Sequence, residues 1–384
     1  MVKMIEKIVE ETKAYYCLDC GKCTSSCPVA MLNPRFSPRL LVEQALIGFE
    51  NLVVRDAELW SCLTCGACSN YCPSMVDFQK FVRKVREESL KKGLTGIKSH
   101  GGIFNSITKF LCRENIKQDR LGWLTPELRV RQKGETLYFV GCQPYFDIIF
   151  EEIKVNCLDN IAKLVVKLLN KAGIEPVVLA NERCCGHDAL WSGDVETFEK
   201  LLELNLREIK GRGVKRVVTN CPECLRTLKI DYAEYAKIDF EVLHITEMLL
   251  ELANKDKISF SKVDGKVTYH DPCRLGKHLG IYEAPRSLLG MIPGVEFVEM
   301  QNNRGNSLCC GTSLWSNCDM FSESIRVSRL REAQATGAGT LLTACPKCQI
   351  HFKCSLSCDS GRNLDVSLGV EDLVTYVAKA AGVV

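Results

Sequence analysis

The sequence predicts an α+β protein of several domains, in which a small, mainly helical N-terminal module precedes two copies of an α/β unit. Two cysteine motifs of identical spacing lie within the first 73 residues, and a different set of cysteine motifs occurs twice further along the chain. Around those repeats, segments with strand and helix patterns alternate. We therefore expect a helical module over residues 1–92, a connector over 93–134, and α/β units over 135–260 and 261–384.

The composition is that of a soluble globular protein, with 46% hydrophobic and 25% charged residues among 384. No apolar run approaches the roughly 20 residues that cross a bilayer, and the N-terminus MVKMIEKIVEETK lacks the apolar core of a signal peptide. We expect a cytoplasmic protein, peripheral to a membrane only through a partner subunit. Lys and Arg are dispersed along the chain, which argues against nucleic-acid binding.

The 23 cysteines are the outlying feature of the composition. In a long chain without a secretion signal, they argue against a disulfide scaffold and for metal or redox chemistry. The formal net charge of +3 counts every thiol as neutral. Because metal-bound thiols are deprotonated, the metal-loaded protein should be close to neutral or acidic.

Residues 17–28 read CLDCGKCTSSCP and residues 62–73 read CLTCGACSNYCP. Both fit C-x2-C-x2-C-x3-C-P, the signature of paired [4Fe–4S] clusters in bacterial ferredoxins, in which the fourth cysteine of each motif binds the other cluster. A pair of zinc sites is the alternative, but it would use C-x2-C pairs with a longer gap. We expect one cubane [4Fe–4S] cluster on Cys17, Cys20, Cys23 and Cys72, and a second on Cys62, Cys65, Cys68 and Cys27.

The rest of the module has helical patterns, which suit a small electron-transfer domain. Residues 37–49 predict a helix that begins with Ser37 and Pro38, and residues 76–93 predict a second helix that ends at Gly93. The connector has no clear periodicity apart from a short helix around residues 107–115. Its single cysteine, Cys112, is expected to be structural.

Three cysteine landmarks of the first α/β unit return in the second. The first cysteine recurs 131 residues later, the Cys-Cys-Gly motif 125 residues later, and the Cys-Pro-x-Cys motif 124 residues later. A one-residue deletion therefore falls just after the Cys-Cys-Gly, and the pattern indicates a duplicated structural unit. Each copy supplies five cysteines, which are Cys142, Cys184, Cys185, Cys221 and Cys224 in the first and Cys273, Cys309, Cys310, Cys345 and Cys348 in the second.

These cysteines follow strand-like segments. Pro222 and Pro346 suit the first turn of a helix, so each Cys-Pro-x-Cys should connect a strand to a helix. The alternation predicts mainly parallel, Rossmann-like sheets, whose ligands gather at the carboxyl ends of the strands. The expected strands cover 135–142, 174–180, 214–220, 265–273 and 339–344, and a helix is expected over 160–173.

Five thiols in one unit exceed the four that a cubane cluster needs. Either the fifth is a reactive thiol beside a cluster, or the cluster is not a cubane. A third interpretation, that the Cys-Cys pairs are small buried hydrophobic residues, fits poorly with a duplicated set of five. Spacing alone leaves the first two alternatives open.

A cysteine followed by Cys-Cys-Gly and then Cys-x-x-Cys resembles the cysteine-rich CCG domain, and two tandem copies resemble the catalytic B subunit of heterodisulfide reductase. The N-terminal module resembles the C subunit, and the fused order resembles the D subunit, over nearly the whole chain. The resemblance implies a noncubane [4Fe–4S] cluster on each five-cysteine set, with the two clusters flanking a disulfide that they cleave reductively. The spacing of 42 residues from Cys142 to Cys184, against 36 in the second copy, puts only a loop length in doubt.

The expected function is therefore the catalytic iron–sulfur subunit of a heterodisulfide-reductase-type complex, reducing a small-molecule disulfide such as CoM–S–S–CoB to two thiols. No dinucleotide-binding G-x-G-x-x-G follows a predicted strand, so the electron donor should be another protein. A flavoprotein like the A subunit of that enzyme or a membrane cytochrome b subunit is implied. The alternative is an electron-transfer subunit of a glycolate, lactate or glycerol-3-phosphate oxidoreductase, or of a sulfate-reduction complex acting on a protein disulfide or trisulfide.

His187 follows the first Cys-Cys-Gly and is the candidate catalytic proton donor, because cleaving a disulfide to two thiols consumes protons. The alternative is a hydrogen bond to cluster sulfur. Arg274, Lys277 and His278 follow Cys273 and could contact an anionic substrate or neutralise a cluster.

The remaining side chains have structural interpretations. The expected core includes Trp191 and Trp315, and His270 is expected to order its surroundings through hydrogen bonds. The cysteines outside the ligand patterns are expected to be unligated; they include Cys157, Cys318, Cys354 and Cys358.

Overall fold

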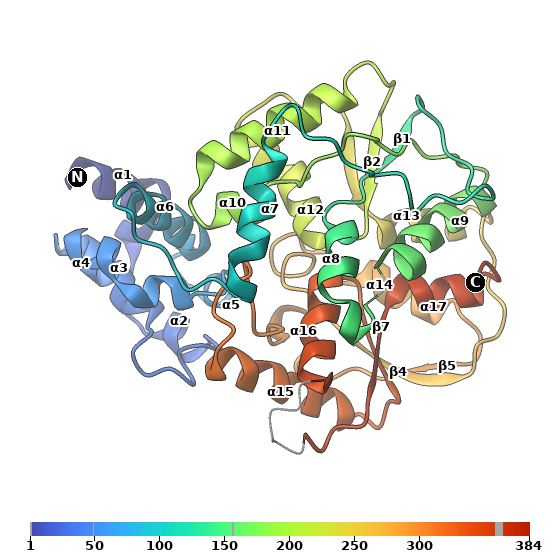
Figure 1. Ribbon diagram of the computed structural model, residues 1–384. Helices are drawn as coiled ribbons and strands as arrows, with labels where there is room; N and C mark the ends of the chain where they lie inside the picture. The colour runs from blue at the N-terminus through green and yellow to red at the C-terminus, as the bar shows by residue number, and fades with distance from the viewer. Residues whose placement is uncertain (1, 49, 156, 358–363) are drawn as a thin grey trace.

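The N-terminal module is built from short helices (Figure 1, blue), and its described residues form no strand. The computed structural model describes residues 2–48, 50–155, 157–357 and 364–384. Ser37 caps a helix as predicted, since its Oγ accepts a hydrogen bond from the Leu40 amide at 3.3 Å. The helices of the module are α1 (Val2–Glu11), α2 (Lys22–Ser25), α3 (Pro38–Leu46), α4 (Glu50–Arg55), α5 (Ala67–Asn70) and α6 (Phe78–Lys91).

The connector packs against both α/β units. Its helix α7 (Ile103–Leu111) begins four residues earlier than predicted, directly after Gly102, whose φ of +77° ends the preceding turn. Phe104 on this helix stacks on Trp315, with ring centroids 3.9 Å apart and planes 16° apart. The connector is therefore an ordered part of the core between the module and the α/β units.

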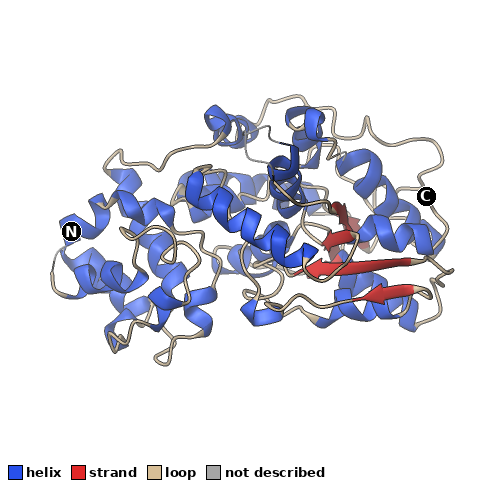
Figure 2. Ribbon diagram, turned by 90° about the horizontal axis from the view of Figure 1, so that it is seen from below, coloured by secondary structure: helices blue, strands red, loops and turns tan. Residues whose placement is uncertain are grey.

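Each α/β unit contains a parallel sheet (Figure 2). The first sheet has the order β1-β2-β3, and the second has the order β5-β4-β6-β7. Every named pair is parallel, and the helices connect successive strands. In the described part of the chain, every helix is too short or too polar to cross a bilayer.

The predicted strand at 174–180 was wrong in extent. In this segment only Val177 pairs, through isolated parallel bridges to Arg131 and Leu137. These bridges lie along the edge of β1 that corresponds to the edge of β4 where β5 pairs in the second unit. Pro176 faces the Arg131 side, where its carbonyl accepts a hydrogen bond from the Arg131 amide at 3.0 Å; because it lacks an N–H group, it donates nothing to that side.

The first unit contains β1 (Thr136–Tyr138), α8 (Gln143–Ile149), α9 (Lys163–Lys171), α10 (His187–Trp191), α11 (Val195–Ile209), β2 (Arg216–Thr219), α12 (Pro222–Arg226), β3 (Glu241–His244) and α13 (Ile245–Asn254). The second contains β4 (Gly265–His270), α14 (Glu283–Gly290), β5 (Val295–Phe297), α15 (Met320–Gln334), β6 (Thr340–Thr343), α16 (Pro346–Ser357), β7 (Gly369–Asp372) and α17 (Leu373–Ala380). The helix predicted over 160–173 is α9, and a π-helix over Cys157–Ala162 precedes it.

One buried arginine ties the module to the first unit. Arg86 on α6 is fully buried, and it donates to the carbonyls of Leu59 (3.0 Å) and Cys62 (2.8 Å) in the module and to Trp191 (3.3 Å) in the first unit. Its guanidinium also lies over the Trp60 ring, 5.2 Å from the centroid. Burial lowers the pKa of Arg86 to about 10, so the side chain remains charged at neutral pH.

We predict that Arg86→Met lowers the free energy of unfolding by about 3 kcal/mol, because it leaves several buried carbonyl groups without donors. The matched control is Lys91→Met on the same helix, whose ammonium makes only surface pairs with Glu87 and Glu88 and should cost less than about 0.5 kcal/mol. Anaerobic urea unfolding followed by circular dichroism measures both. Equal midpoints for the two variants would contradict the assigned role of Arg86.

Candidate functional site

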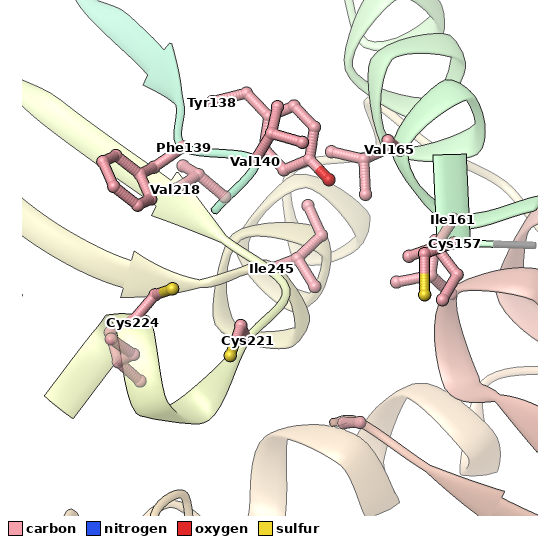
Figure 3. Close-up of a cluster of buried hydrophobic side chains, with 14 of the residues drawn as sticks. Tyr138, Phe139, Val140, Cys157, Ile161, Val165, Val218, Cys221, Cys224 and Ile245 are labelled. Atoms are coloured by element: carbon pink, nitrogen blue, oxygen red, sulfur yellow. The ribbon is translucent and has the colours of Figure 1, made fainter. Parts of the chain in front are cut away.

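The five cysteines of the first unit meet at the carboxyl end of its sheet. Cys142 follows β1, and Cys221 and Cys224 lie where β2 passes into α12 (Figure 3). The thiols of Cys142 and Cys184 lie 3.4 Å apart. All five cysteines of this unit line one small cavity of about 20 Å³, together with His187, Asp188, Glu223 and Lys347.

The second unit brings its five cysteines together in the same order. Sulfur–sulfur hydrogen bonds connect Cys273 to Cys309, Cys309 to Cys310, Cys310 to Cys348, and Cys348 to Cys345. Four of these residues are buried, and Cys273 is half-buried. The sequence-predicted sets of five therefore lie together in space within each unit.

The glycine of each Cys-Cys-Gly motif is required by the backbone. Gly186 and Gly311 have φ values of +86° and +88°, which other residues rarely adopt. A Cβ on Gly186 would lie 2.8 Å from the Phe198 ring, and a Cβ on Gly311 would overlap the carbonyl oxygen of Ser322. These turns aim each Cys-Cys pair into its thiol set, and they leave no room for a side chain.

In the module, the second motif is buried and the first is more exposed. Cys27, Cys62, Cys65 and Cys68 line one small cavity of about 10 Å³, so a cysteine of the first motif joins three of the second. Among the other four, Cys20 is exposed and the rest are half-buried. Cys17 is close enough to Cys23 to contribute to its raised pKa, after the larger effect of burial.

The module meets the second unit through two thiols. A hydrogen bond from Cys309 lowers the pKa of Cys65 to about 6, so a cysteine of the second ferredoxin motif touches the Cys-Cys pair of the second unit. A groove of about 570 Å³ reaches these two sulfurs from the surface, and Lys22 and Lys277 are among its lining residues. The thiols thus form a continuous series from the module into the second unit.

The two α/β units face each other through their Cys-Pro-x-Cys turns. Glu223 and Lys347 occupy the same position of the repeat, and they form an ion pair with each other at 2.5 Å. Lys347 also binds both carboxylate oxygens of Asp188, at 2.7 and 2.8 Å. Burial raises the pKa of Cys345 to about 11, and the nearby Cys221 thiol adds to this shift. The two sets of five thiols therefore lie on either side of a buried charged cluster.

Cations cover both tryptophans of the repeat. Arg274 lies over Trp191 at 4.7 Å from the ring centroid, and Lys347 lies over Trp315 at 5.0 Å. Arg274 also donates to Thr64 in the module and approaches Cys273 Sγ at 3.8 Å. Arg274 is buried among these groups, beside a thiol of the second unit. This position suits the second of its two predicted roles, which was to neutralise the charge of a cluster.

His187, the predicted proton donor, is buried at the edge of the first thiol set. Its Nδ1 lies 3.0 Å from Thr227 Oγ1, and its Nε2 accepts a hydrogen bond from Arg274 at 3.3 Å. Burial and the nearby charges of Arg274 and Lys347 hold the pKa of His187 well below its usual value. Both ring nitrogens are thus engaged by neighbours other than thiols.

Sequence patterns did not single out three polar residues of the site. Glu223 and Lys347 stand between cysteines of the recognised motifs, so only their equivalence in the repeat and their opposite charge could have suggested a pair. His351 lies one helical turn after Cys348, and its Nδ1 lies 3.2 Å from Cys310 Sγ. Neither feature follows from spacing alone, because each requires a contact between distant segments.

The other cysteines lie outside these sets. Cys157 is fully buried next to Ile161, well apart from Cys221 and Cys224 in Figure 3. Cys112 is half-buried and donates to the Thr108 carbonyl at 3.5 Å. Cys354 lies on α16 and Cys318 is exposed; Cys358 is outside the described residues.

The donor sets fit iron–sulfur clusters. One set of four thiols and one set of five each surround a cavity, and thiolate sulfur is the ligand that holds such clusters in proteins. Buried cations lie beside these sulfurs, as the charge of a metal–thiolate group requires.

Comparisons with known proteins agree with these features. The cysteine-rich domain family model, CCG, matches residues 136–229 and 267–353, and the 4Fe-4S dicluster domain model matches residues 13–76. The D subunit of the dihydromethanophenazine:CoB–CoM heterodisulfide reductase from Methanosarcina acetivorans is 34% identical over 78% of this chain and 72% of its own length. The corresponding D subunit from Methanosarcina barkeri is 34% identical over 69% of this chain and 64% of its own length.

A solved structure of a hypothetical protein from Helicobacter pylori has a similar fold, with a TM-score of 0.55 and 14% identity over 100% of this chain and 77% of that one. This chain belongs to the family of heterodisulfide reductase D subunits and is an iron–sulfur oxidoreductase subunit with [4Fe–4S] domains.

Proposed function

We propose that this chain is the catalytic iron–sulfur subunit of a heterodisulfide-reductase-type complex, which reduces a disulfide to two thiols. The observation that carries the proposal is the placement of two five-thiol sets on either side of the Glu223–Lys347 pair. The family relatives are named for the CoB–CoM heterodisulfide, and we propose a disulfide of this kind as the substrate.

In this proposal the chain holds four clusters. The module would hold two cubane [4Fe–4S] clusters, and each CCG unit would hold a noncubane [4Fe–4S] cluster on its five cysteines, in Rossmann-like surroundings. When bound, the clusters would carry electrons and supply them to the disulfide. The module set is Cys17, Cys20, Cys23 and Cys72 with Cys62, Cys65, Cys68 and Cys27; the CCG sets are Cys142, Cys184, Cys185, Cys221 and Cys224, and Cys273, Cys309, Cys310, Cys345 and Cys348.

Protein side chains prepare the space between the CCG sets for negative charge. Cleavage of a disulfide produces two sulfur anions or thiols, and buried cations stabilise such charge strongly because little water screens them. Arg274 supplies such a cation beside Cys273, whereas the charge of the Lys347 ammonium is balanced by Asp188 and Glu223, which hold it in place. His187 would orient Arg274 through its Nε2, and proton delivery by its ring stays a prediction.

Electrons would enter at the module. Cys20 of the first ferredoxin motif is exposed, whereas Cys65 of the second motif is buried against Cys309. A partner protein would therefore bind near the first motif, and electrons would pass through the second motif to the CCG units. The partner we propose is a flavoprotein subunit or a membrane cytochrome b subunit. The competing function is electron relay alone, in a flavoprotein oxidoreductase with the same two domain types.

We predict that the purified holoprotein oxidises reduced viologen anaerobically when the CoM–CoB heterodisulfide is the acceptor. Cys310→Ala should lower turnover by about 100-fold or more, because losing a ligand exceeds the cost of roughly 10–100-fold for an outer-shell change. Cys318→Ala removes an exposed thiol outside both sets and should leave turnover unchanged. A protein with full iron content that shows no turnover with this acceptor would favour electron relay instead.

We also predict that Gly311→Ala lowers the iron content by about four atoms per chain, the content of one cluster, because a Cβ there collides with the Ser322 carbonyl. Gly339→Ala is the control in the same unit, since no atom lies within 4 Å of its added Cβ. Colorimetric iron analysis of anaerobically purified protein measures both. Full iron content in Gly311→Ala would show that the Cys-Cys-Gly turn does not shape the site.

A further inference from the structure

A histidine forms a hydrogen bond with a thiol in the second CCG unit, and none does so among the described residues of the first. His351 Nδ1 lies 3.2 Å from Cys310 Sγ, and the side chain is 5% exposed. On α16, His351 follows Cys348 by three residues, so the two side chains lie on one face of the helix beside the thiol set. Within the described part of the chain, His351 Nε2 has no hydrogen-bond partner.

The tautomer follows from these contacts. A neutral imidazole carries one proton, and a proton on Nε2 would be a buried donor without an acceptor. A proton on Nδ1 instead faces the sulfur of Cys310, which accepts hydrogen bonds once it is a metal-bound thiolate. The hydrogen bond therefore runs from His351 Nδ1 to Cys310 Sγ.

The first unit has the opposite arrangement. Its residue three positions after the Cys-Pro-x-Cys motif is Thr227, whose Oγ1 lies 3.0 Å from His187 Nδ1 and which is not bonded to a thiol. The residue after Cys-Cys-Gly is His187 in the first unit and Thr312 in the second. His and Thr therefore occupy opposite positions in the two units. In the second unit the imidazole hydrogen-bonds to a cysteine sulfur, whereas in the first it hydrogen-bonds to the threonine.

The backbone agrees with this difference. In the first unit, α12 ends at Arg226 and a π-helix follows over Thr227–Asp231, whereas α16 continues without interruption to Ser357. A π-turn changes the direction in which the residue after the motif projects, and such turns are frequent at functional sites.

We infer that His351 is a positioning residue that donates a hydrogen bond to the Cys310 ligand and thereby raises the reduction potential of the cluster in the second unit. A hydrogen bond to a ligand sulfur stabilises the reduced, more negative state of a cluster more than the oxidised state, and such bonds are among the groups that set cluster potentials. The inference rests on the proposed clusters. It makes the two CCG sites unequal, with the site that touches Cys65 the better acceptor for electrons from the module.

The test is a redox titration of the anaerobic holoprotein without any disulfide, followed by electron paramagnetic resonance. His351→Leu and His351→Thr both remove the imidazole donor, and the threonine copies the residue that the first unit carries there. Each should lower the midpoint potential of one CCG-site signal and leave the other in place. His351→Gln retains a side-chain N–H, so its midpoint potential should lie between those of the wild-type protein and the other two variants. Thr227→Val, at the equivalent position of the first unit, should leave both signals unchanged.

Unchanged potentials in both His351 variants, or an equal shift of both signals, would overturn the inference. If His351→Leu does not fold, His351→Thr still tests the inference, because the first unit already carries a threonine at this position. The titration contains no disulfide, so its result does not depend on the proposed reaction. If the potential shifts as expected but the protein fails to reduce a disulfide, the proposed reaction is wrong and this inference still holds. Wild-type protein without signals from the CCG sites would instead overturn the assignment of clusters to these sites.

Discussion

Crowded thiols in the protein interior are the constraint on which the rest of this structure depends. Metal-bound thiols are anionic, and anions buried away from water need nearby positive charge. The chain supplies it with side chains that are themselves buried, among them Arg86 under the module and Arg274 beside Cys273. Parallel strands place the cysteine loops together at the carboxyl ends of the sheets, where the N-termini of α12 and α16 also point. Fold and charge balance therefore favour the same location for the site.

Duplication explains why there are two such sites, and departures from it explain how they can cooperate. Glu223 and Lys347 are equivalent in the repeat, yet their opposite charges let the two units bind each other at 2.5 Å. An identical residue in both units would have placed two like charges together. The exchange of His and Thr around the cysteine motifs likewise gives two similar thiol sets different neighbours. Contact with the module is also unequal, since Cys65 touches Cys309 of the second unit.

Motif spacing predicted much of this arrangement. The CCG motifs identified the five cysteines that lie together in each unit, and the ferredoxin motifs identified one set of four that shares a cavity. The order of strands and helices predicted parallel α/β units. Local signals also located α3 through Ser37 and Pro38, and α6 through its helical spacing and the glycine at position 93. The strand predicted around Val177 is reduced to single bridges, and α7 begins earlier than predicted because Gly102 sets its start. Contacts between units, such as Lys347 with Asp188, depend on how the two sheets pack, and no local pattern encodes that packing.

The central claim is that each five-cysteine set holds an iron–sulfur cluster, with the two sets facing each other through their Cys-Pro-x-Cys turns. Anomalous diffraction at the iron absorption edge, from crystals of anaerobically purified protein, tests it most directly. The account predicts four separate groups of iron, two in the module and one bounded by all five cysteines of each CCG unit. Iron missing from either five-cysteine set, or a cluster that leaves one of the five sulfurs unbound, would contradict it.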